Sequence, residues 1–329
     1  MSNAALLRTP LLTGLLCLLV GAPQLAQAGC RIVDLMPAFW RSLAAGDAPA
    51  AVRAKVLDAH PDLYNRDYVS LPADRKEWET TLQQERAYVE SHRNEVSAAQ
   101  QYLLAHVPRY MEEFRQTFPD YRCDYVFYVA PSFNRMDGAA AFVHGQHRIV
   151  FAPDVIARVH KLSDLKVLID HETFHIYHHQ ATGEFGASAE AVPPTVVALW
   201  GEGLATFVSW RMNPEVTLDS ALLQPGIPEG ARIHLADIAK DLLAHLDDKD
   251  PNTFAHYFVA GRQPDGYPPR AGYYVGVLLA QSLSKRYTLQ QLAKLHGPPL
   301  HQALSLELRR IADDTQTPAP PDRAAHVSH

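Results

Sequence analysis

The chain has 329 residues, of which 47% are hydrophobic and 20% are charged. Such a composition is typical of one large globular domain or two closely packed lobes, and it excludes a disordered or fibrous protein. The formal net charge is −6, and acidic and basic residues are interspersed without a long basic stripe, so we expect no nucleic-acid partner.

Residues 1–28 are predicted to form a signal peptide. Arg8 is the only early charge, residues 11–20 form a short apolar run, and residues 26–28 (AQA) supply the small side chains of a cleavage site. A bilayer-spanning helix needs about 20 apolar residues, and neither this run nor any later segment is long enough. We therefore expect an exported protein, periplasmic or secreted, without a transmembrane segment.

Two cysteines follow the predicted signal peptide, since Cys17 lies within it. In an exported protein Cys30 and Cys123 can oxidise to a disulfide, which is the pairing we predict. The alternative is a lipid anchor on Cys30, because residues 28–30 (AGC) resemble the end of a lipoprotein signal. Gln27, however, stands where such a signal usually has leucine, and this favours the disulfide.

Residues 29–121 are predicted to form an N-terminal helical lobe, because apolar residues recur there at three- and four-residue spacing. The pattern then changes. Residues 123–131, 139–145 and 147–153 are short, rich in β-forming residues and bounded by turn residues, so they predict a small antiparallel sheet. The segment 147–151 is the predicted edge for pairing with an extended peptide.

Helical patterns return after the sheet and make up the rest of a predicted catalytic region, residues 122–316. Predicted helices cover residues 153–159, 164–180, 195–212 and, with interruptions, 233–308, and Gly183 ends the second of them. Residues 317–329 are rich in proline, alanine and polar residues and are predicted to be a flexible tail. The predicted fold class is α+β and mainly helical, with the small sheet directly before the helix 164–180.

The sequence His171-Glu172-Thr173-Phe174-His175 matches the H-E-x-x-H pattern of zinc enzymes and falls within that predicted helix. Four residues of helix turn by about 400° and rise by about 6 Å, so His171 and His175 leave the same face one turn apart. Glu172 lies about 100° round from His171, where a carboxylate reaches a metal-bound water. The pattern predicts two metal ligands and a general base.

Catalytic zinc needs three protein ligands and one open position, so a third ligand must come from elsewhere in the chain. The metzincin pattern is excluded, because its third histidine would fall on Ala181, and the reversed H-x-x-E-H order is absent. Glu202 is the best candidate, because a lone acid between glycines in an apolar helix costs free energy of desolvation unless it has a partner.

The segments HETFH (171–175) and EGLATF (202–207) resemble those of gluzincins, the zinc peptidases whose third ligand is a glutamate. The segments MPAFW (36–40) and RAGYYVGVLLAQSL (270–283) extend the resemblance to a bacterial domain-of-unknown-function family predicted to be zinc-dependent proteases. The resemblance spans residues 34–283 and implies a zincin-like fold with a helical C-terminal lobe. It also implies that His171, His175 and Glu202 bind Zn2+ and that Glu172 is the base.

The last of these segments supplies further candidate site residues. By analogy with tyrosines in gluzincin sites, Tyr273 or Tyr274 is expected to donate a hydrogen bond to the oxyanion. Arg270 is expected to bind a carboxylate of the substrate.

The chain departs from thermolysin-like gluzincins, which carry an acid four residues after the ligand glutamate to orient a ligand histidine; here that position is Thr206. Asp170 and His178 are the substitutes we consider. Asp170 also suits an exposed helix face, and His178, like His179, suits a solvated helix end. The loop 183–194 is expected near the mouth of the cleft, because the link between the two ligand helices is long.

We therefore expect a zinc peptidase acting on a peptide or protein substrate, in which the metal activates a water and Glu172 takes its proton. The alternative is a non-catalytic periplasmic binding or envelope-assembly module with a structural metal. A structural site needs a fourth protein ligand, for which His178 and Asp170 are the first choices. A third interpretation is hydrolysis of an amide or ester in a non-protein substrate such as a cell-wall peptide.

Overall fold

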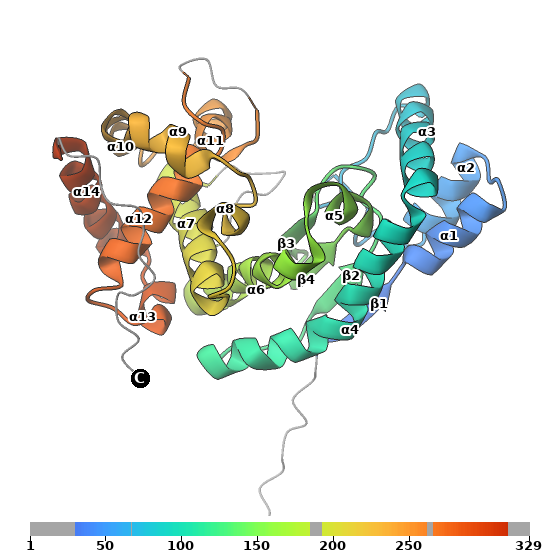
Figure 1. Cartoon of the computed structure of the whole chain (residues 1–329), viewed down its shortest axis with the longest axis horizontal. Helices are drawn as coiled ribbons and strands as arrows, with labels where there is room; N and C mark the ends of the chain where they lie inside the picture. The colour runs from blue at the N-terminus through green and yellow to red at the C-terminus, as the bar shows by residue number, and fades with distance from the viewer. Residues whose placement is uncertain (1–29, 67, 185–192, 262–265, 315–329) are drawn as a thin grey trace, which may run out of the picture.

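Helices pack against one face of a small β-sheet in the computed structural model of the protein (Figure 1), and Leu63, Tyr68 and Val69 cover the other face. The structure describes residues 30–66, 68–184, 193–261 and 266–314. The predicted signal peptide and the predicted tail lie outside the described residues. In the described part, no helix is both long and apolar enough to cross a membrane.

The larger of two hydrophobic core clusters runs through the described residues from the first helix to the last. The strands are β1 (Arg31–Asp34), β2 (Val126–Val129), β3 (Gly138–Val143) and β4 (Gln146–Phe151). The helices up to the sheet and just after it are α1 (Met36–Ala44), α2 (Pro49–Val52), α3 (Arg75–Ser91), α4 (Arg93–Thr117), α5 (Pro153–Val159) and α6 (Leu165–Thr182). The C-terminal helices are α7 (Thr195–Met212), α8 (Leu218–Ala221), α9 (Ile227–Ile233), α10 (Leu235–Ala244), α11 (Pro251–Phe258), α12 (Ala271–Leu283), α13 (Leu289–Ala293) and α14 (Gly297–Asp313). A π-helical turn, η1 (Arg53–Leu57), follows α2, and a 3-10 turn, η2 (Leu162–Asp164), precedes α6.

The four strands form one mixed sheet in the order β1-β2-β4-β3. Strands β1, β2 and β4 are parallel, and only β3 runs antiparallel, to β4. The α+β class and the three predicted strands are confirmed, but the prediction of an antiparallel sheet that begins after residue 121 is wrong. Helices α1 to α4 form the long crossover that the parallel neighbours β1 and β2 require. Because this pairing joins segments that lie far apart in the sequence, no local sequence pattern predicts it.

Strand β3 forms an edge of the sheet, and β4 lies inside it between β2 and β3. The prediction that residues 147–151 form the edge is therefore wrong, because β4 has a partner strand on each side. The β3–β4 hairpin turns through His144 and Gly145, whose φ angles of 50° and 75° are those that a type I′ turn requires.

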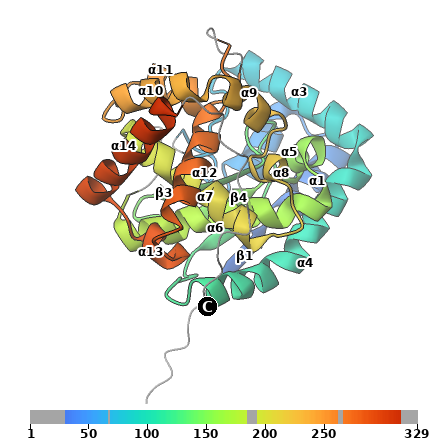
Figure 2. The same ribbon diagram turned by 60° about the vertical axis from the view of Figure 1, so that its left-hand side comes forward.

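Helix α6 lies between the sheet and the C-terminal helices, with contacts to β3 and to α7 (Figures 1 and 2). Most of its residues are buried, which explains why apolar residues occur all round it and not on one stripe. Gly183 follows the last turn in the left-handed conformation, with φ 76°, and so ends the helix where the sequence predicts.

Helices α7 and α12 cross in direct backbone contact, side by side in Figure 2. A Cβ atom added to Gly203 of α7 would lie 2.2 Å from Cα of Gly276 of α12, and one added to Gly276 would lie 2.5 Å from Cα of Gly203. Only glycine at both positions allows this approach. The crossing brings the part of α12 that carries Tyr273 close to the part of α7 that carries Glu202.

A disulfide joins Cys30 and Cys123, which lie just before the parallel strands β1 and β2. Their Cα atoms are 4.9 Å apart, within the range that a disulfide allows. This is the predicted pairing. A sulfur atom in a disulfide carries no thioether-linked lipid, so the arrangement favours the disulfide over a lipid anchor on Cys30.

Candidate metal centre

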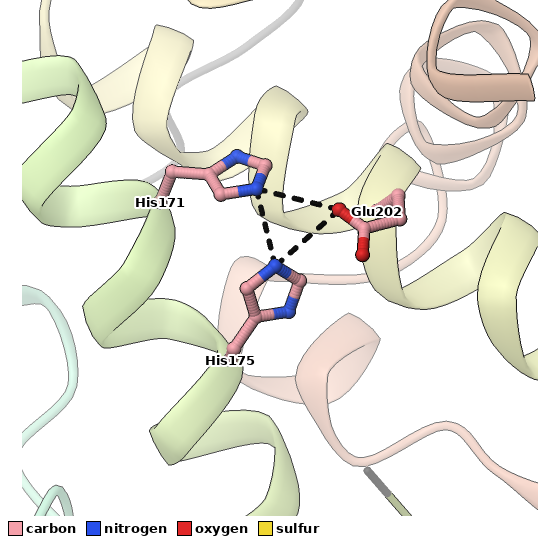
Figure 3. A group of neighbouring side chains, drawn as sticks. All are labelled: His171, His175 and Glu202. Atoms are coloured by element: carbon pink, nitrogen blue, oxygen red, sulfur yellow. Dashed lines mark hydrogen bonds and ion pairs between the residues drawn. The ribbon is translucent and has the colours of Figure 1, made fainter. Parts of the chain in front are cut away.

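Three side chains from two helices meet at one point (Figure 3). His171 and His175 stand one turn apart on α6, and Glu202 comes from α7. The Nε2 atoms of the two histidines are 3.1 Å apart, and each lies 3.4 Å from Oε2 of Glu202. The structure thus brings together the three predicted ligands, in a group that could hold a metal ion. We call these three residues the metal cluster.

The spacing of the metal cluster suits a tetrahedral ion. Ligand atoms about 2.0–2.1 Å from zinc lie roughly 3.3 Å from one another in a tetrahedron, close to the 3.1 Å and 3.4 Å observed. Burial opposes a charge on Glu202, yet His175 and His171 hold the pKa of its carboxyl well below the usual value. Burial also acts to lower the pKa of His175, but the charge of Glu202 raises it to about 9. The cluster therefore favours a positive charge at its centre.

Glu172, the predicted base, lies beside the metal cluster. Its Oε2 accepts a hydrogen bond of 2.7 Å from the backbone N–H of Ala140, so the edge strand β3 fixes one oxygen of the carboxylate. Burial raises the pKa of Glu172, against the opposing effect of the two nearby histidines. A carboxyl group with a raised pKa is suited to take up and return a proton near neutral pH.

A cavity of about 230 Å³ surrounds the cluster. It is lined by His171, Glu172, His175, Glu202, Leu223, Arg270, Tyr273 and the segment 137–140 that leads into β3. Tyr274 does not line the cavity and is completely buried. Successive residues of a helix point about 100° apart, so only one of the two tyrosines can face the cluster. The structure places Tyr273 there.

Tyr273 and Arg270 stand at the start of α12. The Tyr273 ring is nearly parallel to the ring of His171, with 6.4 Å between their centroids, and the guanidinium carbon of Arg270 lies 4.0 Å from the Tyr273 centroid. Burial raises the pKa of Tyr273, and the carboxylate of Glu202 raises it further. The hydroxyl therefore stays protonated and can donate a hydrogen bond inside the cavity.

Thr206 and Asp170, the positions considered for orienting a ligand histidine, form hydrogen bonds to other groups. Thr206 donates its hydroxyl hydrogen to the main-chain carbonyl of Glu202, at 2.8 Å. Asp170 accepts hydrogen bonds from Lys166 and Asn213, both at 2.7 Å. It is fully buried, so an exposed helix face is the wrong interpretation of this residue.

The prediction that His178 and His179 form a solvated helix end is wrong, because α13 packs against α6. His178 is only 4% exposed, its ring stacks on Phe174, and burial lowers its pKa to about 3, so the imidazole is neutral. His179 is half-buried and its Nδ1 shares a hydrogen bond of 2.7 Å with Nε2 of His147. Neither histidine belongs to the metal cluster.

Asp137 and Leu223 also line the cavity, and neither was predicted as a site residue. One oxygen of Asp137 accepts the backbone N–H of Gly138 at 2.9 Å, and the other is 2.6 Å from Nε2 of His160. The local sequence at Asp137 shows only a turn, and that at Leu223 shows no pattern, because each reaches the cavity through the path of a loop.

A fourth ligand from His, Cys, Asp or Glu does not complete the cluster within the described residues. Asp170 and His178, the predicted additions, are not among the residues that converge there. Residues 185–192 of the predicted loop at the cleft mouth lie outside the described residues. Three protein ligands beside a cavity are the arrangement of a catalytic zinc site, whereas a structural site has four.

Comparison with known proteins adds no family to this geometry. A scan against protein-family models and searches of curated proteins and of solved structures found no match to this chain.

Proposed function

We propose that this protein is a zinc-dependent peptidase with a gluzincin-like site. In it, His171, His175 and Glu202 bind the metal and Glu172 acts as general base. The observation that carries the proposal is the convergence of three ligand atoms from α6 and α7, 3.1 Å and 3.4 Å apart, in a cavity that also contains Glu172. We also propose that the protein is exported, because residues 1–28 have the pattern of a signal peptide.

The roles of the chain's own residues follow from their contacts. Zinc, when bound, supplies a Lewis acid that polarises a carbonyl and acidifies water. The Ala140 N–H holds Oε2 of Glu172, which leaves Oε1 to accept a proton from the attacking water and pass it to the leaving amine. The Tyr273 hydroxyl donates to the developing oxyanion, and one such donor contributes about 3 kcal/mol in typical enzymes. Strand β3, at the edge of the sheet, offers backbone groups to an extended peptide.

Metal removal tests the proposal directly. The purified protein is expected to contain zinc in equimolar amount, measured by inductively coupled plasma mass spectrometry. A chelator is expected to abolish hydrolysis of a peptide mixture, and added zinc to restore it, because the attack on the carbonyl needs a Lewis acid. Full hydrolysis by the metal-free protein would contradict the proposal.

Zinc binding also tests the role of Glu202. Glu202→Gln is expected to lower the affinity for zinc by at least about 100-fold, because loss of a ligand has a larger effect than loss of a residue that only orients a ligand. The matched control is Glu307→Gln on α14, which alters an acid paired with Arg286 and Arg310 outside the cavity. The control is expected to keep its zinc. Equal zinc content in both variants would rule out Glu202 as a ligand.

A further inference from the structure

Arg270 is a cation in the wall of the cavity that surrounds the metal cluster. Its guanidinium lies over the Tyr273 ring and interacts with the hydroxyl of the same residue. Within the described residues, no carboxylate lies at ion-pair distance from it. A guanidinium carries five N–H donors in a planar fork that matches a carboxylate, so Arg270 can bind a carboxylate in the cavity as well as contact Tyr273.

The backbone of Arg270 is held in an unusual conformation. Its φ and ψ are 60° and 26°, in the left-handed region, and Leu223 in the same cavity wall has φ 58°. Residues other than glycine seldom adopt this region, and those that do gather at ligand-binding sites, where the surrounding structure imposes the strain. The fold thus directs the Arg270 side chain into the cavity at a cost in backbone energy.

The cavity also contains an acid outside the catalytic group, Asp137, but both of its oxygens have partners. Oδ1 accepts the N–H of Gly138 at 2.9 Å, and Oδ2 is bonded to His160 at 2.6 Å. Asp137 is therefore less available to an amino terminus than Arg270 is to a carboxylate. This difference favours recognition of the carboxyl end of a peptide over recognition of its amino end.

The distance from Arg270 to the metal cluster limits the length of chain between them. Tyr273 separates the two, 6.4 Å from the His171 ring and 4.0 Å from the guanidinium carbon. One residue of extended chain spans about 3.3–3.6 Å, so a carboxylate on Arg270 lies within roughly three residues of a carbonyl at the cluster. The cavity of about 230 Å³ is small enough to suit such a short segment.

We propose that Arg270 binds the C-terminal carboxylate of the substrate, so that the protein removes short segments from the carboxyl ends of peptides. This inference rests on the proposed peptidase function. The step is a hydrolysis: the C–N bond breaks, the hydroxyl of water joins the acyl carbon, and the remaining proton passes by way of Glu172 to the amine nitrogen. Water is the only co-reactant.

Binding tests the inference without turnover. Zinc-loaded Glu172→Gln protein is titrated in a calorimeter with an N-acetylated tripeptide that has a free C-terminal carboxylate, and with its C-terminal amide. The acid is expected to bind about 10- to 100-fold more tightly, the range for hydrogen bonds to a charged group. Adding Arg270→Asn is expected to remove this preference, because asparagine tolerates the left-handed backbone but carries no charge.

Two further variants separate the role of Arg270 from a general effect on the protein. Arg270→Lys is expected to keep part of the preference, since it retains the charge and loses the planar fork. Arg309→Gln, at an exposed position of α14, is expected to keep all of it. The melting temperature of each variant, compared with the parent, shows whether the fold is intact.

Several outcomes would overturn the inference: equal binding of acid and amide, a preference that survives in Arg270→Asn, or an amidated peptide with an internal aspartate that binds as tightly as the free acid. Mass spectrometry of wild-type digests gives a second check, because cleavage of acid and amide peptides at equal rates also contradicts it. If neither peptide is cut but the Arg270-dependent preference remains, the peptidase function fails while the carboxylate site stands.

Discussion

Two polar cavities of similar size, about 230 and 250 Å³, border buried acids that have opposite surroundings. The first contains the metal cluster. At the second, Glu85 of α3 and Asp154 of α5 are buried against hydrogen-bond donors. Asp154 accepts hydrogen bonds from the backbone N–H groups of Ser132, at 3.0 Å, and Asn134, at 3.3 Å. Glu85 accepts a hydrogen bond of 2.7 Å from Arg158. We call Glu85, Asp154 and Arg158 the Glu85 cluster.

The two sets of buried acids differ in the groups that surround their carboxyl oxygens, and this difference indicates which set forms a functional site. In the Glu85 cluster, the Arg158 guanidinium and backbone N–H groups donate hydrogen bonds to the carboxyl groups, so the acids link α3, α5 and the loop before β3. In the metal cluster, two imidazole nitrogens and a carboxylate oxygen, all able to donate electron pairs, lie 3.1 Å and 3.4 Å from one another. Such an arrangement is stable when a cation supplies the missing positive charge.

The largest expected effect compares the same substitution at Glu172, beside the metal cluster, and at Glu85, in the Glu85 cluster. Glu172→Gln is expected to lower kcat by about 10²- to 10⁴-fold, the usual contribution of a general base. It should keep its zinc, because the amide oxygen can still accept the Ala140 N–H. Glu85→Gln is expected to leave kcat unchanged. Peptide turnover and metal content, measured on the same samples, check both expectations. If Glu172→Gln hydrolyses peptides at the wild-type rate, Glu172 is excluded as the base.

A smaller effect concerns the helix crossing that supports the metal cluster. Gly203→Ala is expected to lower the free energy of unfolding by about 1–3 kcal/mol, because the new Cβ would meet the backbone of Gly276 at 2.2 Å. Gly201→Ala is the matched control, since nothing lies within 4 Å of its Cβ position. It is expected to raise stability by roughly 0.5–1 kcal/mol. Urea unfolding of both variants measures the difference, and equal effects would show that the crossing is loose.

The smallest expected effect is a pH dependence of stability in the Glu85 cluster. Burial and the neighbouring Asp154 raise the pKa of Glu85 from 4.5 to about 8. Its protonated form therefore stabilises the fold fully below pH 4.5, and this contribution is lost as the pH rises through 8. Between pH 5 and 8, the wild-type Tm is expected to fall by several °C more than that of Glu85→Gln. Parallel Tm curves would show that Glu85 titrates normally.

The metal cluster itself could largely be predicted from the sequence. The H-E-x-x-H spacing on a helix sets His171 and His175 on one face through geometry that involves only neighbouring residues. The isolated acid Glu202 stands out within an apolar helix because its burial needs a partner. The end of α6 at Gly183 follows from equally local chemistry. The pairing of Cys30 with Cys123 could be predicted because they are the two cysteines that follow the predicted signal peptide.

Other features were decided only by the tertiary structure, because they depend on residues far apart in the chain. The pairing of β1 with β2, the place of β3 at the edge, and the burial of His178 are of this kind. Gly203 looked like a mere flank of Glu202, yet it permits the contact with Gly276 that brings α12 to the site. Local periodicity determines where helices form and which side chains share a face. Which helices and loops then meet around the metal cluster is set by packing, for which a single segment carries no signal.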